Sequence, residues 1–441
     1  MKRAYNLLPG LSLILLTLLL FNKALTNPFF QDDYLLLWLG WLKKSSDFWQ
    51  FFAFVPHFPY RPIAIHLFGA LVVHGFGMNA FYSHMLLFGL HLFNTLLVWH
   101  FIRLLTKRRT TAYIGGVIYA VSTAQFIPLF WWATVYMVLG TTFTLLLTIV
   151  LLGEQRSMRT IIVSSLLFLL MLITNESLFV FPVFYLIYLL IIKPKNPISP
   201  WPFFLIAGIF IVIKMRYGAY PVSGDYAIGT VPQIIATIKW YLLRAVNISE
   251  GVRQMPRLMK LLTTFLLSLW GSMWLFRVVK HRLSIFRMGL LGLSWFFIFC
   301  GPFFLLVFHA SPYYLNTALV GVALCVAIGW SYRSNNSIFE KMITVVWLSL
   351  YVGVSFININ YLQKTHWVVW RADVAQQYIN RVQMMYPHLP KNATVVFINT
   401  KVDPSEISIA LSGEKALQLW YHDPTLRVVY GDEIDGYIVT D

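Results

Sequence analysis

The sequence predicts an all-α polytopic membrane protein with a small α/β section near its C-terminal end. Of the 441 residues, 58% are hydrophobic and only 12% are charged. Soluble domains carry about a quarter charged residues, because their surfaces must face water. Apolar runs of about 20 residues recur along the chain, and each is long enough to cross the hydrocarbon core of a bilayer. We therefore expect lipid to be the main solvent of this chain.

The excess positive charge lies between the apolar runs. A net charge of +17 would by itself allow a nucleic-acid partner. However, Lys and Arg gather in short clusters that separate the apolar runs, at 107–109, 156–159, 193–195 and 280–287. This is the positive-inside pattern, which sets the orientation of spans. No cluster alternates with aromatic residues in the way that stacking on bases requires. We expect membrane lipids as partners and no nucleic acid.

The spans follow from the apolar runs and the basic clusters taken together. The first, near 7–22, is expected to lead out of the cytoplasm, and the second, near 81–104, returns to the basic cluster at 107–109. The remaining spans are expected near 112–128, 131–152, 160–174, 177–192, 201–217, 257–279, 286–308, 313–331 and 341–360. The prediction is about eleven transmembrane helices, with the N-terminus inside and the C-terminus outside.

Three external segments remain, at 23–80, 218–256 and 361–441. The apolar stretch 62–76 is short and rich in His, and a crossing there would put the cluster at 107–109 outside, so we treat 23–80 as one external loop. The tail predicts helices over 370–385 and 405–421 and strands over 394–398, 426–430 and 437–439. We divide the chain into a membrane domain, 1–360, and a small soluble extracytoplasmic α/β domain, 361–441.

The pair Asp32-Asp33 is the most distinctive polar feature, in "NPFFQDDY" just beyond the first span. Near a bilayer surface a carboxylate needs a basic partner, a metal or a substrate. One aspartate could act as a general base, its pKa raised by its like-charged neighbour. The pair also leaves open a divalent cation, Mg²⁺ or Mn²⁺. The alternative is a solvated turn with a helix N-cap. Cys300 and Cys325 lie in apolar runs, so no thiolate metal site is expected.

Further polar residues are predicted to face the same side of the membrane. Glu176 lies in a tight turn between two spans, where a helix cap is its alternative role. Arg61 could bind a phosphate through its planar fork or reach lipid headgroups. The other candidates for substrate or phosphate binding, with headgroup contact as the alternative for the basic ones, are His57, Tyr60, Lys239, Arg244, Arg253, Arg257, His309 and Tyr313.

His84, His91 and Asn94 are separated by seven and three residues in the second predicted span. This spacing puts them on one face of a helix. No spacing of the His-x-x-x-His kind accompanies them, so a hydrogen-bonded structural face is favoured over a metal site.

Four stretches together resemble a known family. They are "NPFFQDDY" after the first span, "YRPI" at the start of the next apolar segment, "FYSHMLLFGLHLFNTLLVWHFIRLL" as the second span and "TNESLFVFP" after the fifth. They resemble the integral membrane glycosyltransferases of the C fold, especially protein O-mannosyltransferases and their bacterial relatives, over about the first half of the chain. Asn175 departs from the pattern, because relatives often carry a lysine before the acidic residue. Trp131-Trp132 lacks the aspartate expected of an oligosaccharyltransferase.

The resemblance implies a catalytic carboxylate at Asp32 or Asp33, with Arg61 and Glu176 in the same cavity. It implies sugar transfer from a polyprenyl-phosphate donor to a glycan, lipid or protein acceptor on the extracytoplasmic face. We expect a bacterial plasma membrane with an outward-facing site, or alternatively the endoplasmic reticulum with a lumenal one. A lipid-linked glycan flippase or transporter and a non-catalytic assembly subunit are the alternative functions. Acidic residues outside the tail lie mostly at span ends or in loops, which favours transfer over transport.

Overall fold

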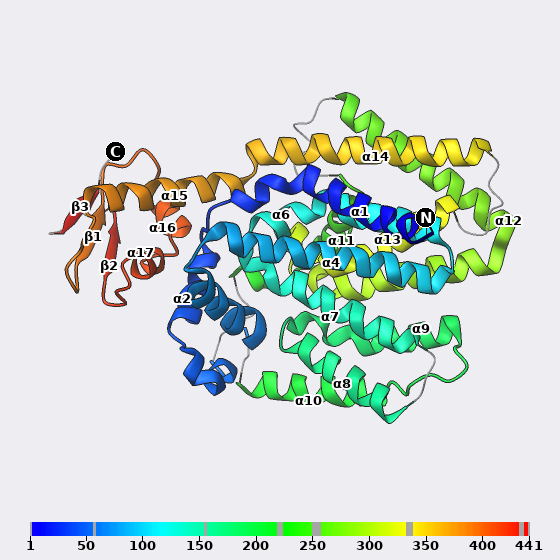
Figure 1. The fold of residues 1–441 in the computed structure, drawn as a ribbon, viewed down its shortest axis with the longest axis horizontal. Helices are drawn as coiled ribbons and strands as arrows, with labels where there is room; N and C mark the ends of the chain where they lie inside the picture. The colour runs from blue at the N-terminus through cyan, green and yellow to red at the C-terminus, as the bar shows by residue number, and fades with distance from the viewer. Residues whose placement is uncertain are drawn as a thin grey trace.

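The fold is a bundle of long apolar helices joined to a small section with three strands, as the computed structural model shows (Figure 1). The structure describes residues 2–55, 59–153, 157–217, 224–248, 257–331, 338–431 and 436–439. The bundle helices are α1 (Lys2–Phe21), α4 (Ala80–Thr106), α5 (Arg109–Val121), α7 (Val135–Leu152), α8 (Met158–Leu172), α9 (Phe181–Ile192), α10 (Trp201–Tyr217), α11 (Val231–Ala245), α12 (Arg257–Phe304), α13 (Leu315–Ser331) and α14 (Ile338–Thr365).

Seven helical segments within the described residues are long and apolar enough to cross a membrane, or eight if one bent pair counts as a single span. Shorter apolar helices cover Met158–Leu172 and Glu176–Ile192. A chain with this many such segments is a multi-pass integral membrane protein, which confirms the predicted class. The segment Pro62–Gly75 is a shorter apolar helix and is not among the seven.

The expected span at 112–128 is broken near Ser122. Beyond α5 the chain continues as η5 (Thr123–Gln125) and α6 (Phe126–Phe130), after a bend of 47°. The Asn247 side chain accepts a hydrogen bond from the Thr123 N–H at 2.8 Å, and Asn316 donates to the Gln125 side chain at 2.7 Å. Irregular backbone at membrane depth is tolerated where other protein groups satisfy it. The span predicted near 112–128 thus contains a bend, which its apolar run did not reveal because Asn247 and Asn316 are remote in sequence.

Helix α12 contains two spans that pack against each other. A Cβ on Gly289 would lie 3.2 Å from the ring of Trp274, fifteen positions earlier. A straight helix would separate the two residues by about 22 Å. The helix must therefore fold back on itself, and Figure 1 shows its two halves meeting at the right-hand edge. The apolar segments Lys260–Val279 and Ile285–Phe304 correspond to the two spans predicted from the sequence.

The segment after α1 consists of short helices. They are α2 (Asp32–Trp41), η2 (Ser45–Phe52), η3 (Pro62–Leu67), α3 (Phe68–Ala70) and η4 (Leu71–Gly75). Helix α2 lies directly against α3, where a Cβ on Gly69 would come within 2.6 Å of the Leu36 carbonyl oxygen. A side chain at this contact would push α2 and its first residue, Asp32, out of place.

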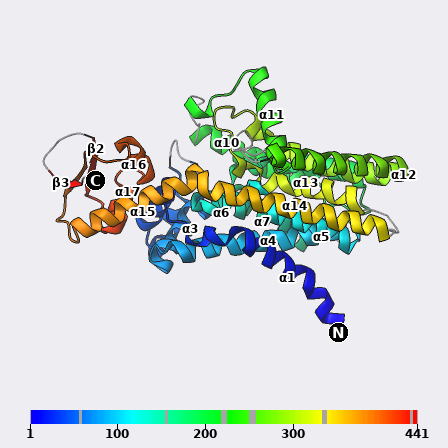
Figure 2. The same ribbon diagram turned by 90° about the horizontal axis from the view of Figure 1, so that it is seen from above.

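The C-terminal section follows α14 almost without interruption. Its elements are α15 (Trp367–Met385), β1 (Thr394–Phe397), α16 (Pro404–Ala410), α17 (Lys415–Trp420), β2 (Arg427–Tyr430) and β3 (Tyr437–Val439). The strands form a parallel sheet in the order β2-β1-β3, with Val395 paired to Val428 and to Tyr437. The strands lie where the sequence predicts them. Figure 2 shows α15 leading from the bundle to this section.

The helix expected over 405–421 is divided into α16 and α17. Ser412 and Gly413 between them have φ values of 55° and 63°. A left-handed residue ends a helix, and glycine adopts this conformation without steric cost. The resulting turn brings the end of α16 to the segment that precedes α2, where the Ala410 carbonyl accepts from the Gln31 N–H at 2.7 Å.

We predict that Gly321→Ala lowers the thermal stability of the detergent-solubilised protein. A Cβ on Gly321 would lie 2.8 Å from the Phe296 backbone nitrogen, and small residues allow membrane helices to approach this closely. Overpacking of this kind costs about 1–3 kcal/mol. Gly353→Ala in α14 is the matched control, because nothing lies within 4 Å of its added Cβ. Equal unfolding temperatures for the two variants would contradict the tight α12–α13 contact.

Candidate functional site

Asp33 is a fully buried anchor. Its Oδ2 accepts from the Phe30 N–H at 3.1 Å, and its Oδ1 accepts from the Ala133 N–H at 2.6 Å. Ala133 lies in η6 (Trp132–Thr134), the turn that leads into α7. Burial raises the pKa of Asp33 well above its usual value, against the effect of the two N–H donors. Asp33 therefore joins the segment after the first span to the beginning of α7.

Asp32 has a different environment. It is the first residue of α2 and is partly exposed. Among the residues that the structure describes, none forms a hydrogen bond or ion pair with its carboxylate. Burial raises the pKa of Asp32 above its usual value, which suits a group that must accept a proton near neutral pH. Of the two aspartates, Asp32 is the one whose oxygens are open to a ligand.

A cationic group lies around Glu176. Arg61 donates to both Glu176 oxygens, from Nε at 2.6 Å and from Nη2 at 2.9 Å. The Lys214 Nζ lies 3.3 Å from Oε1 of the same carboxylate. The guanidinium carbon of Arg61 is 3.8 Å from the ring centroid of Tyr136, a cation–π contact. Two cations thus meet at one carboxylate, and the three charged side chains carry a net charge of +1.

The local sequence explains the position of Glu176. Asn175 is the N-cap of η7 (Glu176–Val180), and its side chain accepts from the Ser177 N–H at 3.2 Å. Although burial opposes ionisation, Arg61 and Lys214 hold the pKa of Glu176 at about 2. Glu176 is therefore ionised at neutral pH and is a poor proton acceptor. Its chemistry here is to orient two cations.

Tyr226 contacts one of the predicted site residues, His309. It lies in η8 (Gly224–Tyr226), and its ring centroid is 4.9 Å from that of His309. The His309 Nε2 lies 3.0 Å from the Tyr313 hydroxyl. Burial raises the pKa of Tyr226, Arg61 lowers it, and Asp32 is among the carboxylates that raise it again. Asp32 and the Arg61 cluster therefore both lie within electrostatic reach of this hydroxyl.

The remaining predicted residues lie elsewhere or are not described. Tyr60 stacks on Phe54 with centroids 5.0 Å apart and donates to the Phe52 carbonyl. Lys239 and Arg257 are exposed at the protein surface. Arg244 packs over Trp240 at 4.7 Å and helps to line a small pocket with Pro312 and His366. His57 and Arg253 lie outside the described residues. Arg61 and Lys214, which contact Glu176 directly, both lie outside the predicted basic segment 239–257.

The polar face of α4 contacts backbone carbonyls of neighbouring segments, in keeping with the structural role that the sequence favours. A ring nitrogen of His84 lies 3.1 Å from the Leu129 carbonyl, and one of His91 lies 3.4 Å from the Ala120 carbonyl. Asn94 donates to the Val138 carbonyl at 2.8 Å. These side chains therefore attach α4 to the broken span and to α7.

The described side chains do not form a complete metal site. No group of three or more His, Cys, Asp or Glu residues gathers in the part of the chain that the structure describes. Both Asp33 oxygens already accept backbone hydrogen bonds, so Asp32 would be the sole protein ligand that the pair offers. The Mg²⁺ or Mn²⁺ ion stays a prediction.

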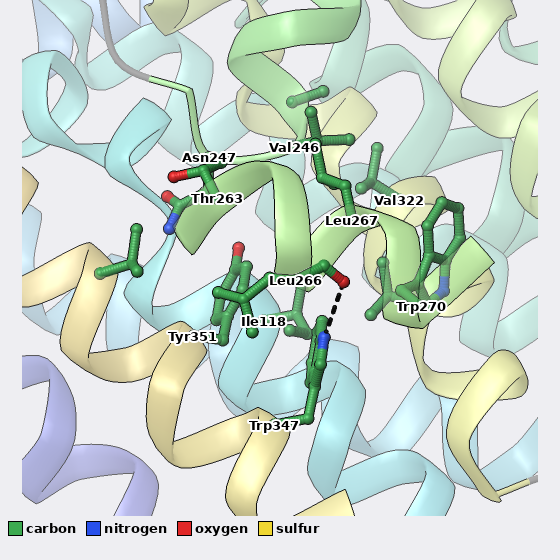
Figure 3. A pocket seen from close by; sticks show the side chains of 13 residues that line it. Ile118, Val246, Asn247, Thr263, Leu266, Leu267, Trp270, Val322, Trp347 and Tyr351 are labelled. Atoms are coloured by element: carbon green, nitrogen blue, oxygen red, sulfur yellow. Dashed lines mark hydrogen bonds between the residues drawn. The ribbon is translucent and has the colours of Figure 1, made fainter. Parts of the chain in front are cut away.

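A separate apolar pocket lies within the helix bundle (Figure 3). Its volume of about 20 Å³ gives room for roughly one water molecule. The Trp347 Nε1 donates to the Leu266 carbonyl across one wall, at 3.0 Å. The lining residues are Ile118, Ala245, Val246, Asn247, Thr263, Leu266, Leu267, Trp270, Val322, Val326, Trp347, Tyr351 and Val354. This pocket is too small and too apolar for a sugar or a phosphate.

Sequence reasoning missed Lys214, Tyr136 and Tyr226. Lys214 did carry a signal, because it follows a long run of uncharged residues in 201–213 and a charge inside a span usually has a function. Its pairing with Glu176 supplies a cation where the resemblance leads us to expect one at position 175. Tyr136 and Tyr226 carry no comparable signal, since the chain contains 23 tyrosines.

No protein-family model matches the chain, and no curated protein matches it significantly. The likeness to C-fold glycosyltransferases therefore remains an expectation from the sequence.

We predict that Asp33→Asn destabilises the fold whereas Asp32→Asn does not. The side-chain amide introduced at position 33 would direct an N–H₂ group at a backbone N–H, and an unsatisfied buried donor costs about 1–3 kcal/mol. Asp32 has no such partner to lose. Thermal unfolding in detergent measures both variants, with Asp32→Asn as the matched control. Similar unfolding temperatures would mean that Asp33 is not the anchor described above.

We also predict that the stability contributed by Glu176 is lost in acid. Its pKa is lowered from 4.5 to about 2 by its two cations. The contribution is complete above the unfolded value and disappears as the pH falls towards the folded one. The difference in unfolding temperature between wild type and Glu176→Gln should therefore shrink as the pH falls from about 4.5 towards 2. Glu414→Gln, at an exposed site, should show little difference at any pH, and a constant difference for Glu176→Gln would contradict the ion-pair assignment.

Proposed function

We propose that the protein is a membrane glycosyltransferase that moves a sugar from a polyprenyl-phosphate donor to an acceptor hydroxyl. One observation carries the proposal: the Asp32 carboxylate, which has no hydrogen-bond or ion-pair partner among the described residues, and Arg61, which shares Glu176 with Lys214, both lie within electrostatic reach of the Tyr226 hydroxyl. This arrangement offers a proton acceptor and a phosphate-binding charge at one site. Transfer from an anionic lipid donor needs both.

Asp32 is the base in this proposal. Its carboxylate takes the proton of the acceptor hydroxyl as the oxygen attacks the anomeric carbon of the donor sugar. The bond from that carbon to the phosphate oxygen breaks, and polyprenyl phosphate leaves with the electron pair. The raised pKa of Asp32 supports this role, because a stronger base takes the proton more readily.

Arg61 and Lys214 stabilise the leaving phosphate. The transition state places increasing negative charge on the phosphate oxygens, and fixed cations lower its energy most where water is scarce. Glu176 holds both cations before the substrate arrives, so that little reorganisation is needed.

The location of the site is part of the proposal. We propose about eleven spans, with the short helices α8, α9 and α10 and the broken pair α5–α6 added to the seven long segments. The N-terminus and the C-terminal strands lie at opposite ends of the bundle, and α2 lies at the end with the strands (Figure 1). With the N-terminus inside, Asp32 would face the extracytoplasmic side of a bacterial plasma membrane.

We predict that Asp32→Asn abolishes transfer while leaving the fold intact. Purified protein in liposomes is supplied with radiolabelled polyprenyl-phosphate hexoses and pentoses, and label transfer and released polyprenyl phosphate are measured. Loss of a general base lowers the rate by about 10²–10⁴-fold. Asp47→Asn, on the same segment after the first span, is the matched control and should retain wild-type transfer.

Two outcomes would contradict the proposal. Full transfer by Asp32→Asn would remove the carboxylate from the chemistry. Movement of the donor lipid between leaflets without sugar transfer would instead identify a flippase. Arg61→Ala with the same donors adds a separate test, since losing the phosphate ligand should slow transfer without changing its pH dependence.

A further inference from the structure

The backbone immediately before Asp32 is in an unfavourable conformation. Gln31 has φ 50° and ψ −122°, a region that side-chain-bearing residues rarely adopt. Such a conformation persists only where the surroundings hold it in place, and it often occurs at functional sites. Relaxation of Gln31 would rotate the first turn of α2 and move the Asp32 carboxylate.

The contacts that hold Gln31 come from the C-terminal section. Its N–H donates to the Ala410 carbonyl at 2.7 Å, at the end of α16. Its side-chain oxygen accepts from the Arg371 Nη1 at 3.1 Å, from α15. Arg371 is fixed in turn by Glu406, with Nε and Nη2 at 3.1 and 2.9 Å from one carboxylate oxygen. The backbone N–H and the side chain of Gln31 are therefore both held by residues more than 300 positions later in the chain.

Aromatic packing fixes the position of α15 against the same segment. Trp367 lies one turn before Arg371 on α15, and the guanidinium carbon of Arg371 is 5.3 Å from its ring centroid. The Trp367 ring meets Phe30 at 6.2 Å and Trp131 at 5.4 Å, both edge-on. Phe30 contacts Trp367 and Gln31 contacts Arg371. These two residues of α15 are one helical turn apart and therefore lie on the same face of the helix.

We propose that Arg371 is a positioning residue for the active-site carboxylate. Through Gln31 it keeps the Asp32 carboxylate in the orientation that proton transfer requires. The C-terminal section therefore contributes to the active site. Arg371 does not touch the substrate. The proposal rests on the proposed function, since it gives the Asp32 carboxylate a reaction to perform.

The central experiment compares Arg371→Ala with Arg381→Ala in the liposome transfer assay. Arg381 is a second arginine of the same helix and packs on Tyr378 at 5.9 Å. We expect Arg371→Ala to lower kcat by at least about tenfold with little change in KM, while Arg381→Ala keeps wild-type values. Arg371→Lys keeps the charge but lacks the planar guanidinium that donates to Gln31 and Glu406 at the same time. Its kcat should therefore resemble that of Arg371→Ala.

The pH profile separates positioning from general destabilisation. A displaced Asp32 would gain water around its carboxylate, and the acid limb of kcat/KM would move to lower pH. Simple loss of folded protein lowers the rate at every pH and leaves the limb in place. A wild-type pH profile for Arg371→Ala, at whatever rate, would overturn the proposal.

The strain at Gln31 gives an independent check. Glycine adopts the Gln31 conformation readily, so the Gln31→Gly background should reduce the effect of Arg371→Ala on kcat by several fold. An undiminished effect in this double-mutant cycle would mean that Arg371 acts by another route.

Failure of the proposed function can be recognised separately. If the wild-type protein transfers no sugar from any donor, the glycosyltransferase proposal fails. Hydrogen exchange still tests whether Arg371 holds Gln31 in place. The Gln31 amide should exchange slowly in wild type and in Arg381→Ala, and at least about tenfold faster in Arg371→Ala. Equal exchange rates in all three proteins would mean that Arg371 does not hold Gln31 in place.

Discussion

The interaction on which the site depends most is the pair of hydrogen bonds that the Asp33 carboxylate accepts from backbone N–H groups. One donor is local, at Phe30, and the other is 100 residues away, at Ala133. A buried carboxylate is costly unless its oxygens are hydrogen-bonded, so this link holds both segments in a single arrangement. Successive residues of a helix point about 100° apart. With Asp33 directed into the protein, Asp32 is left at the more open face of α2.

The charged groups around Glu176 are held in a fixed arrangement. Arg61, Glu176 and Lys214 come from three separate segments, and their partly buried ion pairs lose less to solvent and salt than exposed pairs do. The two hydrogen bonds from Arg61 to Glu176 fix the orientation of the guanidinium as well as its distance from the carboxylate. In the proposed reaction the cations would be in position before the lipid phosphate binds, and such preorganisation makes electrostatic catalysis effective.

Hydropathy and charge bias gave the long helices, because a bilayer fixes both the length and the apolar character of a span. They could not predict the break at Ser122, where Asn247 accepts from the Thr123 N–H and Asn316 donates to the Gln125 side chain. The same limit applies to the site. Asp32 and Asp33 are identical in type and adjacent in sequence, and their different roles depend on Ala133. Glu176 was recognised, but its second cation, Lys214, lies 38 positions away in another helix.

The segment that carries Asp32 must be ordered without a disulfide, since Cys300 and Cys325 are free and buried in α12 and α13. Its order comes from packing at both sides. The Gly40–Gly69 contact fixes α2 against α3, and Arg371 with Ala410 fixes the residue before α2. Helix α15 continues α14 with only His366 between them. The Arg371 contact with Gln31 therefore comes from a helix that follows directly on a helix of the bundle.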